Sequence, residues 1–116
     1  MISYKNRFHG HNSLSYVYRN GDVRRSKHLS VKLCKNRHRK DTRVAVVVSK
    51  KTCKGAIGRN RIRRRIYEWV RPKINQTNQV YDIVIIVSSA EVRTMPADEL
   101  FEQLDTTTKP IFASTT

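Results

Sequence analysis

An arginine-dense stretch, residues 50–74, constrains the fold of this chain more than any other segment. At 100° per residue, the apolar positions that fall on one arc are Ile62, Ile66, Trp69 and Val70. Such an arc is typical of a helix that packs against a core, so the pattern predicts an amphipathic helix over residues 58–71. The ring of Pro72 would clash with the carbonyl four residues earlier, and this helix is expected to end or kink there.

The polar positions of the same helix fall into two stripes. One stripe holds Asn60, Arg64, Tyr67 and Arg71, and the other holds Arg61, Arg65 and Glu68. Arg63 lies just beyond the apolar arc, and Arg59 lies within it in the first turn. Both can pack their stems while their charged ends reach water.

Five arginines stand within residues 59–65, and Glu68 is the acid placed to pair with Arg64, Arg65 or Arg71. The self-repulsion of the others is tolerable when a polyanion neutralises it. A solvated helix face is the ordinary alternative, but this density of guanidinium groups favours a phosphate-binding surface. Further donors close by, just beyond a predicted strand, are Ser49, Lys50 and Lys51.

The charge of the chain is unevenly placed. The net charge of the 116 residues is +15, but residues 1–75 hold 22 Lys or Arg against 3 Asp or Glu, whereas residues 76–116 hold 2 against 6. This asymmetry predicts a basic surface that meets nucleic acid in preference to an anionic membrane. The sequence has no run of 18 apolar residues and no apolar signal core, so no membrane partner and a cytoplasmic location are expected.

Candidate metal-binding residues form no recognisable site. His9 and His11 could be combined with Cys34 or Cys53, but the spacing matches no standard zinc pattern, and the ligands would come from distant segments. Reduced, structural thiols are the ordinary interpretation of the two cysteines, and a disulfide is left open. The protein alone is therefore expected to bind no metal.

Candidate catalytic groups are equally scarce. No two carboxylates stand out as an acid–base couple; Asp82 is interpreted as a strand-start residue and Asp41 as a turn residue. No Ser-His-Asp or Cys-His arrangement is suggested. Residues 54–58 contain two glycines but are too short for a Walker loop and lack its terminal Lys-Ser or Lys-Thr. The chain shows no catalytic equipment of its own.

The remaining segments predict an α+β fold, a two-layer sandwich forming a single domain over residues 1–116. The predicted elements, in the order α, β, β, α, β, α, are a helix over residues 13–19, strands over 29–34 and 43–48, the basic helix, a strand over 80–87 and a last helix starting near Pro96. The basic helix joins strand 43–48 to strand 80–87 by a connection long enough for parallel pairing. Residues 106–116 are expected to fray.

Beyond these patterns, the chain resembles a known family. The segments that carry the resemblance are Val46-Val47-Val48-Ser49-Lys50-Lys51 and Gly58-Arg59-Asn60-Arg61-Ile62-Arg63-Arg64. They are similar to the Ser-Lys-Lys strand end and the Arg-Asn-Arg-Ile helix of the bacterial ribonuclease P protein component. The likeness continues at residues 14–21, 81–86 and 99–104 and covers about residues 5–105.

This resemblance implies an α-β-β-β-α-β-α sandwich with a four-stranded sheet, and hence a short extra strand near residues 23–27. It also implies a left-handed crossover around the basic helix, against the usual right-handed rule. The protein would be the small subunit of a ribonucleoprotein that removes the 5′ leader from precursor tRNA. Catalytic groups and magnesium ions would then belong to the RNA subunit and the substrate, and the free protein would be a monomer.

The resemblance also assigns roles to residues. A surface for the RNA subunit and for phosphates near the cut site is expected at Arg59, Asn60, Arg61 and Arg64, which match the family motif, at the strand-end Ser49, Lys50 and Lys51, and at the neighbouring Arg63 and Arg65. A cleft that takes the leader as a single strand is expected between the first helix and the open sheet face, at Leu14, Tyr18, Lys32 and Tyr67. Three of these depart from the family's usual residues: Leu14 and Lys32 replace aromatic residues, and Tyr67 replaces a basic one. Leader binding is therefore expected to depend more on charge and less on stacking.

Two other functions stay open from the residues alone. A ribosomal or general nucleic-acid-binding protein could lay the basic helix in a groove, although no leucine heptad follows that helix as in zipper-type DNA binders. A stand-alone nuclease would require metal-dependent cutting without RNA, lost when His9 or Asp82 is replaced. Nothing in the sequence favours the nuclease.

Overall fold

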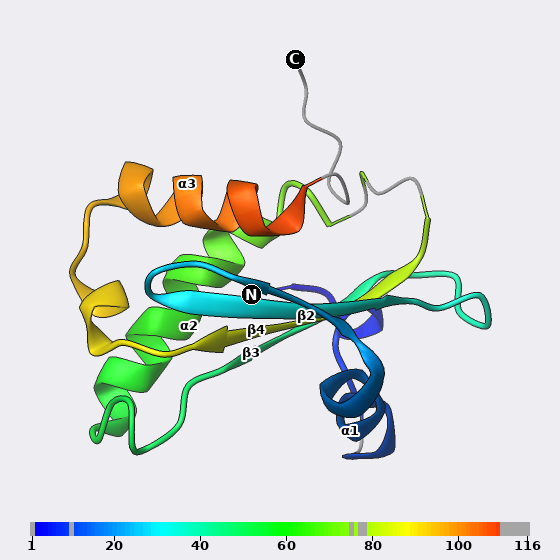
Figure 1. The fold of residues 1–116 in the computed structure, drawn as a ribbon, viewed down its shortest axis with the longest axis horizontal. Coiled ribbons are helices and arrows are strands. Elements are labelled where there is room, and N and C mark those ends of the chain that lie inside the picture. Colours follow the sequence, from blue (N-terminus) through cyan, green and yellow to red (C-terminus); the bar gives the residue numbers. More distant parts are fainter. Residues whose placement is uncertain (1, 10, 75, 77–78, 110–116) are drawn as a thin grey trace.

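The protein is described by a computed structural model that covers residues 2–9, 11–74, 76 and 79–109. Its elements, in chain order, are η1 Tyr4–Asn6, α1 His11–Asn20, β1 Asp22–Arg25, β2 Leu29–Lys35, β3 Arg43–Val47, α2 Ala56–Val70, β4 Tyr81–Val87, η2 Ala90–Arg93 and α3 Ala97–Thr108. One four-stranded sheet has α1 on one side and α3 on the other (Figure 1). The α+β sandwich predicted from the sequence is confirmed.

The strands lie in the order β1-β2-β4-β3. β2 is antiparallel to both β1 and β4, whereas β3 pairs parallel with β4, from Arg43 opposite Asp82 to Val47 opposite Ile86. The helix α2 therefore makes the parallel connection from β3 to β4 that the length of the segment permitted. The left hand of this crossover, implied by the family resemblance, stays a prediction.

The core fills one face of the sheet, which α2 and α3 cover. The apolar arc of α2 supplies Ile62, Ile66, Trp69 and Val70, and all four are buried. They pack with alternate residues of the strands and with Leu100 and Leu104 of α3. The Trp69 indole also donates a hydrogen bond of 2.9 Å to the Asp105 carboxylate, which fixes α2 against α3. Burial of these side chains is the main force that holds the helices on the sheet.

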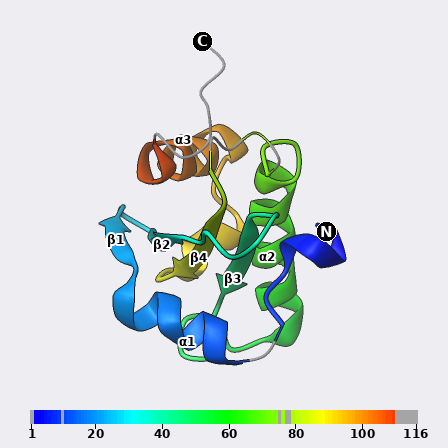
Figure 2. The same ribbon diagram turned by 90° about the vertical axis from the view of Figure 1, so that its right-hand side faces the viewer.

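The opposite face of the sheet is only partly covered. Val17 of α1 and Val84 of β4 are fully buried on this side. Beyond α1 the alternate residues of the strands are partly buried or exposed: Val23, Arg25, Ser30, Lys32, Ala45, Val47 and Ile86. We call this surface the open face. Figure 2 shows α1 crossing below the strands while α2 and α3 lie on the other sides.

Two elements, β1 and α3, test predictions made from the sequence. The extra strand implied by the family is present, as β1 over Asp22–Arg25. The last helix runs through Thr108, so the prediction that residues 106–108 fray is wrong. Thr107 and Thr108 are buried, and their hydroxyls donate to the carbonyls of Gln103 and Leu104 one turn earlier. The rest of the expected tail, residues 110–116, lies outside the described residues.

The N-terminal segment covers the outer edge of β3, which no sequence pattern indicated. The side-chain amide of Asn6, 1% exposed, donates a hydrogen bond of 2.8 Å to the carbonyl of Thr42. Ile2 joins the main core. These contacts protect an edge that would otherwise present unpaired backbone groups. Among the described residues, no helix is long and apolar enough to cross a membrane.

Candidate nucleic-acid interface

Two arginines of α2 point to solvent without an acidic partner. Arg61 and Arg64 are exposed, and no ion pair or hydrogen bond of their side chains is present within the described part of the chain. They border a shallow hollow of about 430 Å³ with Ile57, Asn60, Arg65 and Glu68. Glu68 is engaged by Arg71 at 2.9 Å. The charge of Arg61 and Arg64 is therefore available to an external anion.

The other three arginines of this cluster are bonded within the protein. Arg59 donates from one nitrogen to the carbonyls of Cys53 and Lys54, at 2.9 and 2.6 Å. Arg65 donates to the Val92 carbonyl at 2.8 Å and to the Met95 carbonyl, which ties α2 to η2 and the segment after it. Arg63 donates to the side-chain oxygen of Asn60 at 3.0 Å.

The Ser-Lys-Lys segment forms a tight turn after β3. The Ser49 carbonyl accepts from the backbone N–H groups of Thr52 and Cys53, and the Ser49 and Thr52 hydroxyls are 3.1 Å apart. This turn leaves Lys50 and Lys51 exposed at the end of the open face. Gly58 lets α2 approach the turn closely, because a Cβ there would lie 2.8 Å from the Cys53 sulfur.

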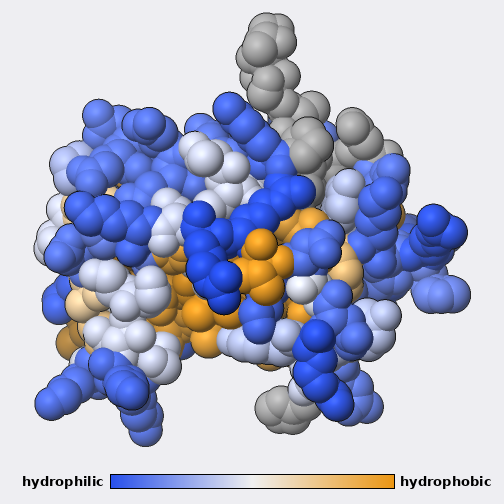
Figure 3. Space-filling model, viewed as in Figure 1, coloured by the Kyte–Doolittle hydropathy of each residue, from blue (hydrophilic) through white to orange (hydrophobic). Residues whose placement is uncertain are grey.

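Of the four residues predicted for a leader cleft, Leu14 and Tyr18 lie on α1, and Lys32 lies beside Tyr18 on the open face. The Lys32 ammonium lies 4.9 Å from the centre of the Tyr18 ring and donates to the Tyr18 carbonyl at 2.8 Å. Burial raises the pKa of the Tyr18 phenol above its usual value, so the phenol stays a neutral donor. Leu14, one turn before Tyr18, is partly exposed. Figure 3 shows an apolar area in the lower middle of the molecule, bordered by hydrophilic side chains.

The prediction that places Tyr67 on a polar stripe and in the leader cleft is wrong. Tyr67 is 9% exposed and belongs to the main core on the α2 side of the sheet, opposite the open face. Burial raises the pKa of its phenol; a hydrogen bond with the Val46 backbone and the charges of Arg63 and Arg7 oppose that shift more weakly. The apolar arc of α2 is wider than the sequence suggested, because α2 also packs beside β3.

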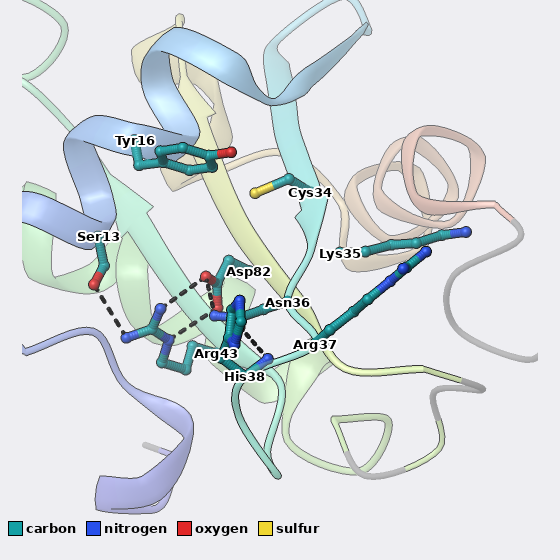
Figure 4. A pocket seen from close by; sticks show the side chains of 9 residues that line it. All are labelled: Ser13, Tyr16, Cys34, Lys35, Asn36, Arg37, His38, Arg43 and Asp82. Carbon is teal, nitrogen blue, oxygen red and sulfur yellow. Dashed lines mark hydrogen bonds and ion pairs between the residues drawn. The ribbon is translucent and has the colours of Figure 1, made fainter.

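A buried ion pair at the start of β3 and β4 was missed by the sequence interpretation. The Arg43 guanidinium donates to both Asp82 oxygens, at 2.9 and 2.7 Å, and lies 4.7 Å from the centre of the Phe8 ring. Asn36 donates a further hydrogen bond of 2.8 Å to Asp82. Both charged side chains are almost fully buried. Figure 4 shows the hydrogen bonds that join Arg43 and Asp82. No signal within either strand could reveal the pair, because it depends on which strands are neighbours.

The two cysteines are free thiols, as the ordinary interpretation predicted. Burial, and then the nearby carboxylate of Asp82, raise the pKa of the Cys34 thiol; Arg43 opposes this, and Asp22 adds a smaller increase. In the described part of the chain, no three His, Cys, Asp or Glu side chains gather into a group that could hold a metal ion.

Comparison with known proteins places these features in context. The model of the family described as Ribonuclease P matches residues 2–111. A ribonuclease P protein component of Pseudanabaena sp. (strain PCC 6903) is 33% identical over 89 residues, which are 77% of this chain and 77% of the relative. One from Prochlorococcus marinus (strain MIT 9301) is 31% identical over 83 residues, covering 62% of this chain and 65% of the relative.

Solved structures show the same fold. The ribonuclease P protein of Staphylococcus aureus superimposes with a TM-score of 0.80 at 23% identity, over 92% of this chain and 97% of that one. The protein from Thermotoga maritima gives a TM-score of 0.73 at 23% identity, over 86% and 92%. The fold is thus retained where fewer than one residue in four is the same.

Proposed function

From the premise that this chain belongs to the ribonuclease P protein family, we propose that it binds the catalytic RNA subunit of ribonuclease P and the 5′ leader of precursor tRNA. Membership implies a part in a ribonucleoprotein endonuclease that processes tRNA. The catalytic groups would lie in the RNA. The magnesium ions would be held by the RNA and the substrate, and the free protein would be a cytoplasmic monomer.

One observation carries this proposal: two arginines and two lysines that have no acidic partner among the described residues are exposed on α2 and on the turn before it. Arg61 and Arg64 project from α2, and Lys50 and Lys51 from the turn that leads into it. Neutralising closely spaced phosphates releases counterions, which makes binding steeply salt-dependent. Neutralised phosphates also let two RNAs approach each other and concentrate hydrated metal ions at the cut site.

The leader strand would lie in the cleft beside Leu14, Tyr18 and Lys32. The Lys32 ammonium has solvent on one side and Tyr18 on the other, so it can contact a phosphate while the ring contacts a base. Because backbone charge and stacking read little base identity, this cleft would accept many leader sequences. Tyr67 has no part in it.

Reconstitution tests the proposal directly. The full chain, mixed with its cognate RNA subunit, should cleave precursor tRNA at the mature 5′ end at physiological magnesium concentration, where the RNA alone is much slower. The protein alone should not cut. No stimulation by a folded protein with a verified RNA subunit would overturn the assignment.

A competition assay separates this function from general nucleic-acid binding. Duplex DNA and unrelated structured RNA, at the same nucleotide concentration, should displace the protein from the RNA subunit or from precursor tRNA far less well than those ligands themselves. Equal competition by all polyanions would favour the general binder.

A further inference from the structure

A second hollow lies on the flank of α1 opposite to the leader cleft. On α1, Leu14 and Tyr18 lie to one side of the buried Val17, and Ser13 and Tyr16 lie to the other. The side chain of Tyr16 overhangs the end of β2, where a hollow of about 380 Å³ opens between α1 and the loop after β2 (Figure 4). We call this the Tyr16 hollow. Its volume is in the range of sites that hold small organic groups.

The charged side chains at the floor of the Tyr16 hollow are already paired with each other. Arg43 and Asp82 pair there through two hydrogen bonds, the remaining Arg43 nitrogen lies 3.4 Å from the Ser13 hydroxyl, and Asn36 caps Asp82. A buried charge with these partners has little attraction left for a ligand. The floor is therefore a rigid base, and any ligand must be held by the walls and the rim.

The wall and the rim have the chemistry of a nucleotide site. Tyr16 is 58% exposed, it lines the hollow together with Cys34, and no other described ring or cation packs on its ring. Lys35 and Arg37 border the same hollow, both are exposed, and neither has an acidic partner among the described residues. In Figure 4 both side chains extend away from the Arg43–Asp82 pair.

We propose that the Tyr16 hollow binds one unpaired RNA nucleotide, with the base stacked on Tyr16 and a phosphate held by Lys35 and Arg37. A tyrosine ring in this position can stack only on a base that has left its helix, so a duplex is not the expected ligand. This inference rests on the proposed function only in taking RNA as the ligand. The nucleotide could come from precursor tRNA or from the RNA subunit.

The thiol of Cys34 makes occupancy measurable. In the full chain carrying Cys53→Ser, Cys34 is the one remaining cysteine. A single-stranded hexauridylate should slow alkylation of Cys34 by iodoacetamide at least threefold. With Tyr16→Ala, the oligonucleotide concentration for half-maximal protection should rise roughly five- to a hundredfold, the range that stacking on one ring gives. Tyr4→Ala, which removes another exposed ring, should change it less than twofold.

The other outcomes each overturn the proposal. Equal protection by a six-base-pair RNA duplex, or by inorganic phosphate alone, would mean that no unpaired base is recognised. Hexauridylate that binds but leaves Cys34 reactive would place the strand in the leader cleft alone, and that binding should be lost with Lys32→Ala. Failure of hexauridylate to bind anywhere would count against the cleft as well, whereas reconstituted cleavage tests the family function separately.

A charge-matched pair sharpens the rim assignment. Arg37→Gln should weaken protection of Cys34 severalfold, and Lys27→Gln, an exposed charge on the β1–β2 turn, should not. If both substitutions weakened protection equally, protection would depend on net charge alone, and the assignment of a phosphate to Arg37 would be wrong. With precursor tRNA and then the isolated RNA subunit as ligands, protection of Cys34 by one and not the other identifies the source of the nucleotide.

Discussion

The clustered arginines of α2 divide into two groups that their sequence does not distinguish. Arg59, Arg63 and Arg65 are hydrogen-bonded to carbonyl oxygens or to Asn60, and we call them the bonded arginines. Arg61 and Arg64, the unbonded arginines, have no such partner in the described structure. A guanidinium has five donors, so it can satisfy carbonyls that no regular element pairs. The density of arginine therefore overstates the charge available to RNA.

The largest effect is expected when both unbonded arginines are removed. Arg61→Ala with Arg64→Ala should weaken binding to the RNA subunit roughly a hundredfold, if each makes one charge-assisted hydrogen bond to phosphate. The salt dependence should also become shallower, by about 1.4 to 1.8 in the slope of log K against log salt. The free energy of unfolding should stay within about 0.5 kcal/mol of the original, as for surface substitutions.

A matched variant shows whether position or net charge is responsible. Lys27→Ala with Lys109→Ala removes the same two charges from exposed positions outside α2. Filter binding across a salt series should show a much smaller loss for this variant. Equal losses in the two double variants would remove the distinction between bonded and unbonded arginines.

The next effect is on stability and concerns a bonded arginine. Arg65→Ala leaves the carbonyls of Val92 and Met95 without their donors, and should lower the free energy of unfolding by about 2 kcal/mol. Arg65→Lys should recover little, because one ammonium group lacks the planar fork that reaches two carbonyls. Urea unfolding of both, beside Arg64→Ala, measures this. If Arg65→Ala left the free energy of unfolding unchanged, Arg65 would belong with the arginines that are available to RNA.

The sequence predicted which face of α2 is buried, but not which of its arginines are bonded within the protein. Ile62, Ile66, Trp69 and Val70 were found because helical period alone fixes which residues share a face. The roles of Arg65 and Tyr67 depend instead on η2 and β3, which meet α2 only in the folded chain. A pattern within one segment contains no information about such partners.

The same limit applies to the sheet and to the Tyr16 hollow. β1 spans only four residues, too few for its alternation to be distinguished from a loop. The hollow combines a helix, three strands and a loop, and its floor requires β3 to pair with β4. The family resemblance supplied the strand but gave no indication of the hollow.

A smaller effect is expected at Arg59, a bonded arginine that supports a turn proposed to bind RNA. Its bonds to Cys53 and Lys54 hold the turn that carries Lys50 and Lys51. Arg59→Ala should cost about 1 kcal/mol of stability, because its side chain is partly exposed. It should also speed hydrogen exchange at the Thr52 and Cys53 amides, with a modest loss of RNA affinity. Unchanged exchange together with a large loss of affinity would instead make Arg59 a direct phosphate ligand.

The smallest effect tests whether Tyr67 lies on the buried or the solvent-facing side of α2. Because burial raises the pKa of the folded phenol, the unfolded chain ionises first as pH rises through about 10, and ionisation then favours unfolding. The stabilisation from keeping Tyr67 neutral is therefore complete below pH 10 and is lost above it. Tyr67→Phe should cost at most about 1 kcal/mol at pH 8, where the hydrogen bond is removed. Its melting temperature should then fall less steeply between pH 9 and 11.

Tyr18→Phe is the control. Burial also raises the pKa of the Tyr18 phenol, but Tyr18 lies on the open face. If RNA binding at pH 8 falls with Tyr18→Phe and not with Tyr67→Phe, Tyr67 belongs with the bonded, structural side of α2. Parallel melting curves for the original chain and Tyr67→Phe, combined with weaker RNA binding, would return Tyr67 to the solvent-facing stripe. Ile66 would then be buried while its neighbour Tyr67 faces solvent.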